Sequence, residues 1–171
     1  MRYQVDIYGE LHTLEDRKRI EAMILEQHGK AKYMFLLLEE IGPHRYVTTA
    51  AKEKAIADQM YSTGPMGLEL AIMLGIPAIG IDLWGKDVHK TDKHDANGFF
   101  TDAKRSFMLR EKHMVEVIEK HRVAGRCAVI VGDTHLRTVT TRELGGPSLI
   151  HKRFRSDRMV KILRSPNGEI K

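Results

Sequence analysis

The sequence predicts one α/β domain, residues 1–171, with a mainly parallel central sheet covered by helices. Short apolar runs alternate along the chain with longer segments of helical periodicity, which is the pattern of parallel strands joined by helical crossovers. The central run, from Cys127 to Val131, is apolar without alternation and predicts a strand buried on both faces. A chain of 171 residues, 42% hydrophobic, is long enough to bury one core without disulfides.

The remaining strands and helices are predicted in the same way, from short apolar runs and from helical periodicity. Strands are expected near residues 3–7, 33–38 and 78–81, and helices over 13–28, 48–60, 66–74, 101–121 and 136–144. Residues 148–154 and 159–163 alternate in hydrophobicity around Arg155-Ser156-Asp157-Arg158. This last pattern predicts a C-terminal antiparallel hairpin at the sheet edge.

Titratable side chains stand where the apolar strands end. Because the carboxyl ends of parallel strands meet at one edge of a sheet, these side chains are expected to form a site. Together they would suit hydrolysis, with a carboxylate or His acting as base on water, or with a bound divalent metal. The candidates, strand by strand, are Glu10 and His12, Glu39 and Glu40, Asp82, and Asp133 and His135.

Arg110 interrupts the apolar stripe of the helix predicted over residues 101–121. A guanidinium that faces a core is unfavourable unless it is paired, and it cannot lose its proton. Arg110 is therefore expected to meet a strand-end carboxylate or an anionic ligand. The alternative is a slightly rotated helix on which Arg110 reaches solvent.

Four motifs resemble those of the erythromycin-esterase, ChaN, TraB and Tiki superfamily, whose members share an α/β fold with two Gly-x-x-His motifs. Gly9-Glu10-Leu11-His12 is similar to the first motif and Gly132-Asp133-Thr134-His135 to the second. Glu39-Glu40 looks like the acid that ends the second strand of the family. Arg110-Glu111-Lys112-His113-Met114 is similar to the Arg-(Asp/Glu)-x-x-Met helix. The resemblance is strongest to the ChaN-like branch.

The resemblance implies a small hydrolase acting on an unidentified small-molecule or anionic substrate. His12 and His135, supported by Glu10 and by Glu39 or Glu40, would activate water directly or hold a divalent metal. Arg110 would bind a substrate anion or orient a carboxylate, and Asp82 and Asp133 would contact substrate. The alternative is a binding protein for haem or another small ligand, with the same histidines as ligands.

Composition narrows the classes of partner. The net charge of +5 is too small to define a nucleic-acid protein, although the basic residues of 151–155 and 158–164 could contact phosphate. No apolar stretch is long enough to cross a bilayer. The single Cys127 suits a reducing compartment, so a cytoplasmic location is expected, with a homo-oligomer left open.

Residues 84–98 form the longest segment without periodicity, which is typical of a functional or mobile loop. His89 and His94 lie in it and could serve as metal ligands. Two histidines in a polar surface loop are more often without such a role.

Overall fold

The structure is a computed structural model that describes residues 2–41, 44–58, 66–83 and 102–168. The strands are β1 (Val5–Glu10), β2 (Phe35–Leu38), β3 (Arg45–Tyr46), β4 (Ala78–Gly80), β5 (Cys127–Gly132) and β6 (Val160–Leu163). The helices are α1 (Leu14–Lys30), α2 (Thr49–Asp58), α3 (Met66–Leu74), α5 (Ala103–His121) and α6 (Leu149–Phe154), with a 3₁₀ turn, η1, over Asp133–Leu136.

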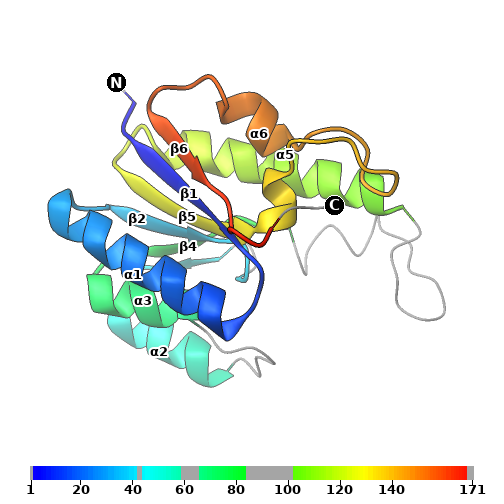
Figure 1. Ribbon diagram of the computed structural model, residues 1–171. Helices are drawn as coiled ribbons and strands as arrows, with labels where there is room; N and C mark the ends of the chain where they lie inside the picture. The colour runs from blue at the N-terminus through cyan, green and yellow to red at the C-terminus, as the bar shows by residue number, and fades with distance from the viewer. Residues whose placement is uncertain (1, 42–43, 59–65, 84–101, 169–171) are drawn as a thin grey trace.

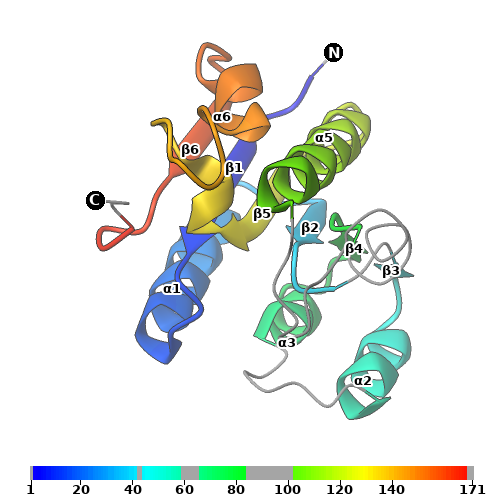
Figure 2. The same ribbon diagram turned by 90° about the vertical axis from the view of Figure 1, so that its right-hand side faces the viewer.

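The strands that are described form one sheet in the order β3-β4-β2-β5-β1-β6. All neighbours pair in parallel except β3, which runs antiparallel to β4 at one edge. Helices α1, α2 and α3 cover one face of the sheet, and α5 and α6 cover the other (Figures 1 and 2). The predicted α/β class, with a mainly parallel sheet between helices, is confirmed.

The central strand β5 contributes to the core on both faces of the sheet. Cys127, Val129 and Val131 belong to the apolar cluster that includes Met114 of α5, whereas Ala128 and Ile130 belong to the cluster on the α1 and α3 side. Successive side chains of a strand point to opposite faces. A run without alternation is therefore what a doubly covered strand requires, as the sequence indicated.

The predicted C-terminal hairpin is wrong. Residues 149–154 form helix α6, which Ser148 caps by accepting a hydrogen bond from the His151 backbone N at 3.0 Å. Ile150 and Phe154 are both buried, and their spacing of four fits a helix face as well as an alternating strand. After α6 the chain returns as β6, which pairs in parallel with β1. The antiparallel pair lies at the opposite edge, in β3 and β4.

Two further expectations concern the membrane and the long loop. In the parts of the chain that the structure describes, no helix has the length and apolar character needed to cross a membrane. The segment 84–98, with His89 and His94, lies outside the described residues.

Gly9, in β1, provides the space into which Asp133 packs. A Cβ atom on Gly9 would overlap Asp133 Oδ1 and come within 3.0 Å of Leu136 Cδ1. Asp133 cannot easily move, because it accepts hydrogen bonds from Arg164 Nε at 3.2 Å and from the Ser165 backbone N at 3.0 Å. The close approach of β1 and η1 thus depends on the missing side chain.

We expect Gly9→Ala to lower the free energy of unfolding by about 1–3 kcal/mol, the usual cost of overpacking a filled site. Gly29→Ala is the matched control, because a Cβ on Gly29 would meet nothing within 4 Å and Gly29 lies in α1. That change should be neutral or stabilise by about 0.5–1 kcal/mol. Urea unfolding of both variants measures the difference, and equal midpoints would contradict this account of Gly9.

Candidate active site

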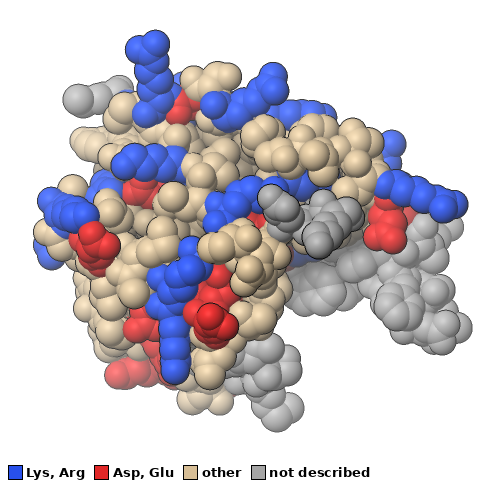
Figure 3. Space-filling view, in the orientation of Figure 1, with Lys and Arg blue, Asp and Glu red and all other residues tan. Residues whose placement is uncertain are grey.

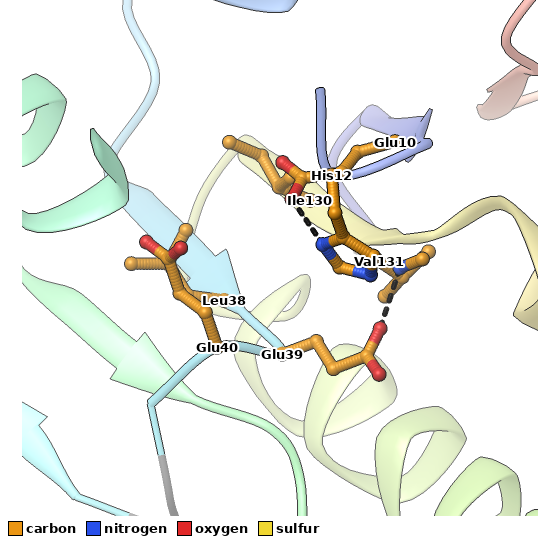
Figure 4. Close-up of a pocket in the computed structure, with 8 residues that line it drawn as sticks. Glu10, His12, Leu38, Glu39, Glu40, Ile130 and Val131 are labelled. Atoms are coloured by element: carbon orange, nitrogen blue, oxygen red, sulfur yellow. Dashed lines mark hydrogen bonds and ion pairs between the residues drawn. The ribbon is translucent and has the colours of Figure 1, made fainter. Parts of the chain in front are cut away.

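The carboxyl ends of β1, β2 and β5 meet around a small cavity (Figure 4). Its volume is about 10 Å³, which is about the space that one water molecule needs. The lining residues are Glu10, His12, Leu38, Glu39, Glu40, Ile130, Val131 and Gly132. The parallel register of these strands brings together side chains that are more than a hundred residues apart in the sequence.

Glu39 and Glu40 leave the end of β2 in opposite directions (Figure 4). Glu39 Oε2 accepts a hydrogen bond from the Gly132 backbone N, and Oε1 accepts one from Arg110 Nη2 at 2.8 Å. The Glu39 Oε1 atom also lies 3.1 Å from His135 Nε2. Burial would raise the pKa of Glu39, but these three partners outweigh it and lower the pKa to about 2. Glu39 is therefore a fixed anion at neutral pH.

Arg110 lies on α5 and reaches the ends of two strands. Its Nε and Nη2 atoms donate to the two carboxylate oxygens of Asp82 at 2.8 and 2.7 Å, while Nη2 also donates to Glu39. Arg110 is 9% exposed and Asp82 is 2% exposed. The guanidinium is thus occupied by two carboxylates, so its geometry suits the orientation of Glu39 better than the capture of a substrate anion.

His135 lies between two carboxylates. Its Nδ1 atom is 3.3 Å from Glu111 Oε1, its Nε2 atom faces Glu39, and its ring stacks on Phe107 with centroids 4.7 Å apart. Burial would lower the pKa of His135, but the charge of Glu39 and the hydrogen bonds with Glu111 and Glu39 raise it to about 9. His135 is therefore an imidazolium at neutral pH.

Glu111 is itself held from three sides. Its Oε1 atom also forms an ion pair with Arg137 Nη1, and its Oε2 atom accepts the Leu149 backbone N–H at 2.9 Å. Burial would raise the pKa of Glu111, but His135, Leu149 and Arg137 lower it. The carboxylate thus fixes His135 and ties α5 to the start of α6.

His12 is the more accessible histidine. Its side chain is 56% exposed, and its Nδ1 atom lies 2.6 Å from Oε1 of the buried Glu10, which also accepts from Arg17 Nη2 at 3.1 Å. The hydrogen bond with Glu10 is the main cause that raises the pKa of His12. The Nε2 atom points toward Gly132, where a Cβ atom would lie 3.3 Å from it. His12 therefore presents its second ring nitrogen, Nε2, to the cavity.

The backbone of His12 is also unusual. Its φ angle is +58°, in the left-handed region that side chains other than Gly, Asn and Asp seldom adopt. Such backbone positions cost about 1–3 kcal/mol and occur often at functional sites.

Glu40 faces the other side of the cavity. Its Oε1 atom accepts the Gly67 backbone N–H at 2.7 Å, and Oε2 is 3.9 Å from Arg17 Nη2. Burial raises the pKa of Glu40 to about 6, aided by the charge of Glu10 and opposed by the Gly67 hydrogen bond. The two adjacent carboxyl groups thus have pKa values near 2 and near 6, so Glu40 can exchange a proton close to neutral pH and Glu39 cannot.

Asp133 does not join this group. It is 3% exposed and points toward the C-terminal segment, where it pairs with Arg164 and accepts the Ser165 backbone N–H. Asp133 was expected among the strand-end residues of the site and in contact with substrate. The η1 turn instead directs its side chain toward Gly9 and Gly168.

The residues do not fit a metal or haem held by the two histidines. Among the described residues, no three His, Cys, Asp or Glu side chains are grouped as metal ligands. Both nitrogens of His135 face carboxylates, and its raised pKa opposes the neutral form that binds metals. The cavity of about 10 Å³ is also far smaller than the roughly 300 Å³ or more of a typical ligand pocket.

The site also contains three charged residues for which no individual role was predicted from the sequence: Glu111, Arg17 and Arg137. The stripe predicted for this helix passed through Arg110, whereas the buried side chains of α5 also include Glu111 and Ile118. A stripe drawn through 107, 111, 114 and 118 has the same helical spacing and would have included Glu111. Arg17 lies three residues before the buried Ile20, so helical spacing would have placed it on the buried face of α1. For Arg137, which follows η1, no periodicity gave a signal.

Comparison with known proteins yields similarity of fold only. No protein-family model matches the chain, and no match is found among the curated proteins. The solved structures that match include RRSP, a MARTX toxin effector domain from Vibrio vulnificus CMCP6, with 15% identity and a TM-score of 0.55. A second, described as a bacterial protein toxin, has 14% identity and a TM-score of 0.51. The chain is covered to 96% and 95%, but it spans only 33% and 34% of these two chains.

The comparisons correct the family suggested by the motifs. The structural neighbours are toxin domains, and nothing in the comparisons points to the erythromycin-esterase, ChaN, TraB and Tiki superfamily. Short motifs such as Gly-x-x-His arise wherever a glycine ends a strand and a histidine follows in the turn. The assignment to the ChaN-like branch is therefore wrong.

We expect Arg110→Met to lower the free energy of unfolding by about 3–5 kcal/mol, because Asp82 and Glu39 would keep buried charges without their partner. Arg110→Lys should recover only part of this loss, since an ammonium cannot donate to both oxygens of Asp82 in one plane. Urea unfolding of the two variants measures both effects.

Arg105→Met is the control for the Arg110 series, because Arg105 lies on the same helix with an exposed side chain. A double variant, Arg110→Met with Asp82→Asn, should be less destabilised than the sum of its single changes. Additive losses would show that the pair does not act as a unit.

We expect NMR titration to find the His135 imidazolium losing its proton near pH 9, whereas His151, whose pKa burial lowers, titrates below its ordinary value near 6.5. The folded protein holds the His135 proton more tightly than the unfolded chain. Its contribution to stability is therefore complete below about pH 6.5 and is lost as the pH rises through about 9.

The free energy of unfolding should accordingly fall more steeply between pH 7 and pH 9.5 in the parent than in His135→Gln. A His135 resonance that titrates near pH 6.5, or parallel pH profiles, would contradict the ion-paired state.

Proposed function

We propose that the chain is a hydrolase in which Glu40 takes a proton from water and the protonated His12 gives one to the leaving group. The observation that carries the proposal is the pair of side chains across the cavity: a carboxyl with a pKa of about 6 and a histidine whose pKa is raised. A pKa of about 6 leaves Glu40 largely ionised near pH 7, as a base requires, and the upward shift of the His12 pKa favours the protonated form that an acid requires.

The size of the cavity supports water as the nucleophile. With about 10 Å³, it accommodates about one water molecule beside Glu40 and His12. Glu40 would abstract the proton with Oε2, because Oε1 accepts the Gly67 N–H. The hydroxide so formed would attack an electrophilic carbon of the substrate at the open side of the cavity.

Glu10 supports His12 as the acid. Its carboxylate faces the Nδ1 atom and stabilises the imidazolium, which leaves the Nε2 proton for transfer. Glu39, Arg110 and His135 act in this proposal as positioning residues, since they hold the β2 and β5 ends together through the Gly132 N–H.

The charges around the cavity favour a neutral substrate. Glu10, Glu39 and Glu40 line it, whereas the guanidinium of Arg110 is already bound by Asp82 and Glu39. We therefore propose a carboxylic ester or amide as the bond that is cleaved, rather than the anionic substrate expected from the sequence. The likeness to toxin domains is one of fold and adds no substrate to this proposal.

We expect the parent to hydrolyse p-nitrophenyl acetate or a peptide p-nitroanilide, but not p-nitrophenyl phosphate. Glu40→Gln and His12→Asn should each reduce kcat by at least ~10²-fold, the usual contribution of a general acid or base. Asn is chosen because it tolerates the left-handed backbone of residue 12. Glu15→Gln, at an exposed glutamate of α1, is the control that should keep the parental rate.

The pH profile distinguishes the two roles. The rate should rise as Glu40 ionises near pH 6 and fall as His12 loses its proton at higher pH. Glu10→Gln removes the carboxylate charge that favours the protonated form of His12, so the alkaline limb should move to lower pH. Because the charge of Glu10 also raises the pKa of Glu40, the acid limb should move to lower pH as well. If the alkaline limb does not move, His12 is not the acid and the assignment is wrong. If no neutral substrate is turned over faster than by the Glu40→Gln/His12→Asn double variant, the chain is not this hydrolase.

A further inference from the structure

A second cavity lies between α6 and the edge strand β6, away from the strand ends that form the candidate active site. Its volume is about 330 Å³, within the range of small-molecule sites. The lining residues are Thr138, His151, Phe154, Arg155, Val160, Ile162 and Arg164. This groove is large enough for a ligand of the size of a substituted aromatic ring, and none of its lining residues is acidic.

The groove has an apolar floor and a cationic rim. Phe154 is buried, and Val160 and Ile162 of β6 are partly buried against the core, so these side chains form a fixed apolar surface. Arg155 and Arg164 supply two guanidinium groups, and His151 supplies an imidazole. Figure 3 shows Lys and Arg side chains along the upper edge of the molecule, over α6 and the loop that joins it to β6, with few acidic ones among them.

The cations of the rim are only partly neutralised by the protein. Arg164 pairs with the buried Asp133, which fixes its position. Within the part of the chain that the structure describes, no acid pairs with Arg155, and the ring of His151 makes no hydrogen bond or ion pair. Burial lowers the pKa of His151 first, and the charges of Arg155 and Arg164 lower it further. Three cationic or protonatable groups therefore face one cavity, an arrangement that an anion would stabilise.

We propose that this groove binds a small amphipathic anion, with its apolar body on Phe154, Val160 and Ile162 and its phosphate or carboxylate between Arg155, Arg164 and His151. The sequence had suggested only that the late basic residues could contact phosphate. The structure adds an apolar floor beside them. Inorganic phosphate would use the rim alone, so the floor predicts a preference for an anion that carries an aromatic or aliphatic group.

Isothermal titration with phenyl phosphate, benzoate, inorganic phosphate and benzyl alcohol tests this proposal and distinguishes the two anionic groups. Phenyl phosphate or benzoate should bind at least about tenfold more tightly than inorganic phosphate and than the neutral alcohol. Arg155→Gln should weaken that binding by about tenfold or more, the effect of losing one charge-assisted contact. Arg158→Gln, at an exposed arginine outside the groove, should leave it unchanged.

The His151 resonance gives a second readout. In the free protein Arg155 and Arg164 face His151 and disfavour its proton, whereas a bound anion should raise its pKa. The proposal is overturned if Arg155→Gln binds as tightly as the parent, if inorganic phosphate binds as well as phenyl phosphate and benzoate, or if the pKa of His151 does not rise on saturation. None of these outcomes depends on hydrolysis at the strand ends.

Discussion

The pairing of Arg110 with Asp82 and Glu39 joins the helix layer to the strand ends and fixes the charges of the candidate site. A guanidinium keeps its charge at every accessible pH, so a helix that buries one must be matched by carboxylates at a defined distance. The match joins α5 to the ends of β4 and β2. From Glu39 it continues through His135 and Glu111 to Arg137, so one buried network of alternating charge connects the sheet, the η1 turn and α6.

This network also determines which groups remain free to take part in chemistry. Glu39 and His135 neutralise each other, and their pKa values are displaced far from neutrality in opposite directions. Neither group can exchange a proton readily near pH 7. Glu40 and His12 line the cavity outside this network; burial raises the pKa of Glu40 to about 6, and the hydrogen bond with Glu10 raises the pKa of His12. The fixed charges thus hold the strand ends in place, whereas Glu40 and His12 can still exchange protons.

The two cavities differ in the charge of the residues that line them. The strand-end cavity is lined by three glutamates and holds about one water molecule, which suits proton transfer to and from a neutral substrate. The groove beside β6 is larger, apolar at its floor and cationic at its rim, which suits retention of an anion. Asp133 stands between these regions, because it packs against Gly9 of β1 and pairs with Arg164 of the groove.

The α/β class and the strand ends at which charged residues gather could be predicted from the sequence, because apolar runs and helical periods are local properties that follow from burial. The sequence also indicated that Arg110 needs a carboxylate or an anionic ligand. Residues 149–154 form a helix because of tertiary packing, since a segment of six residues fits the period of a helix as well as that of a strand. The tertiary structure likewise directs Asp133 away from the site and holds His135 between two acids. Side-chain direction after a strand depends on the turn that follows and on the charges packed against it, and no sequence spacing specifies either.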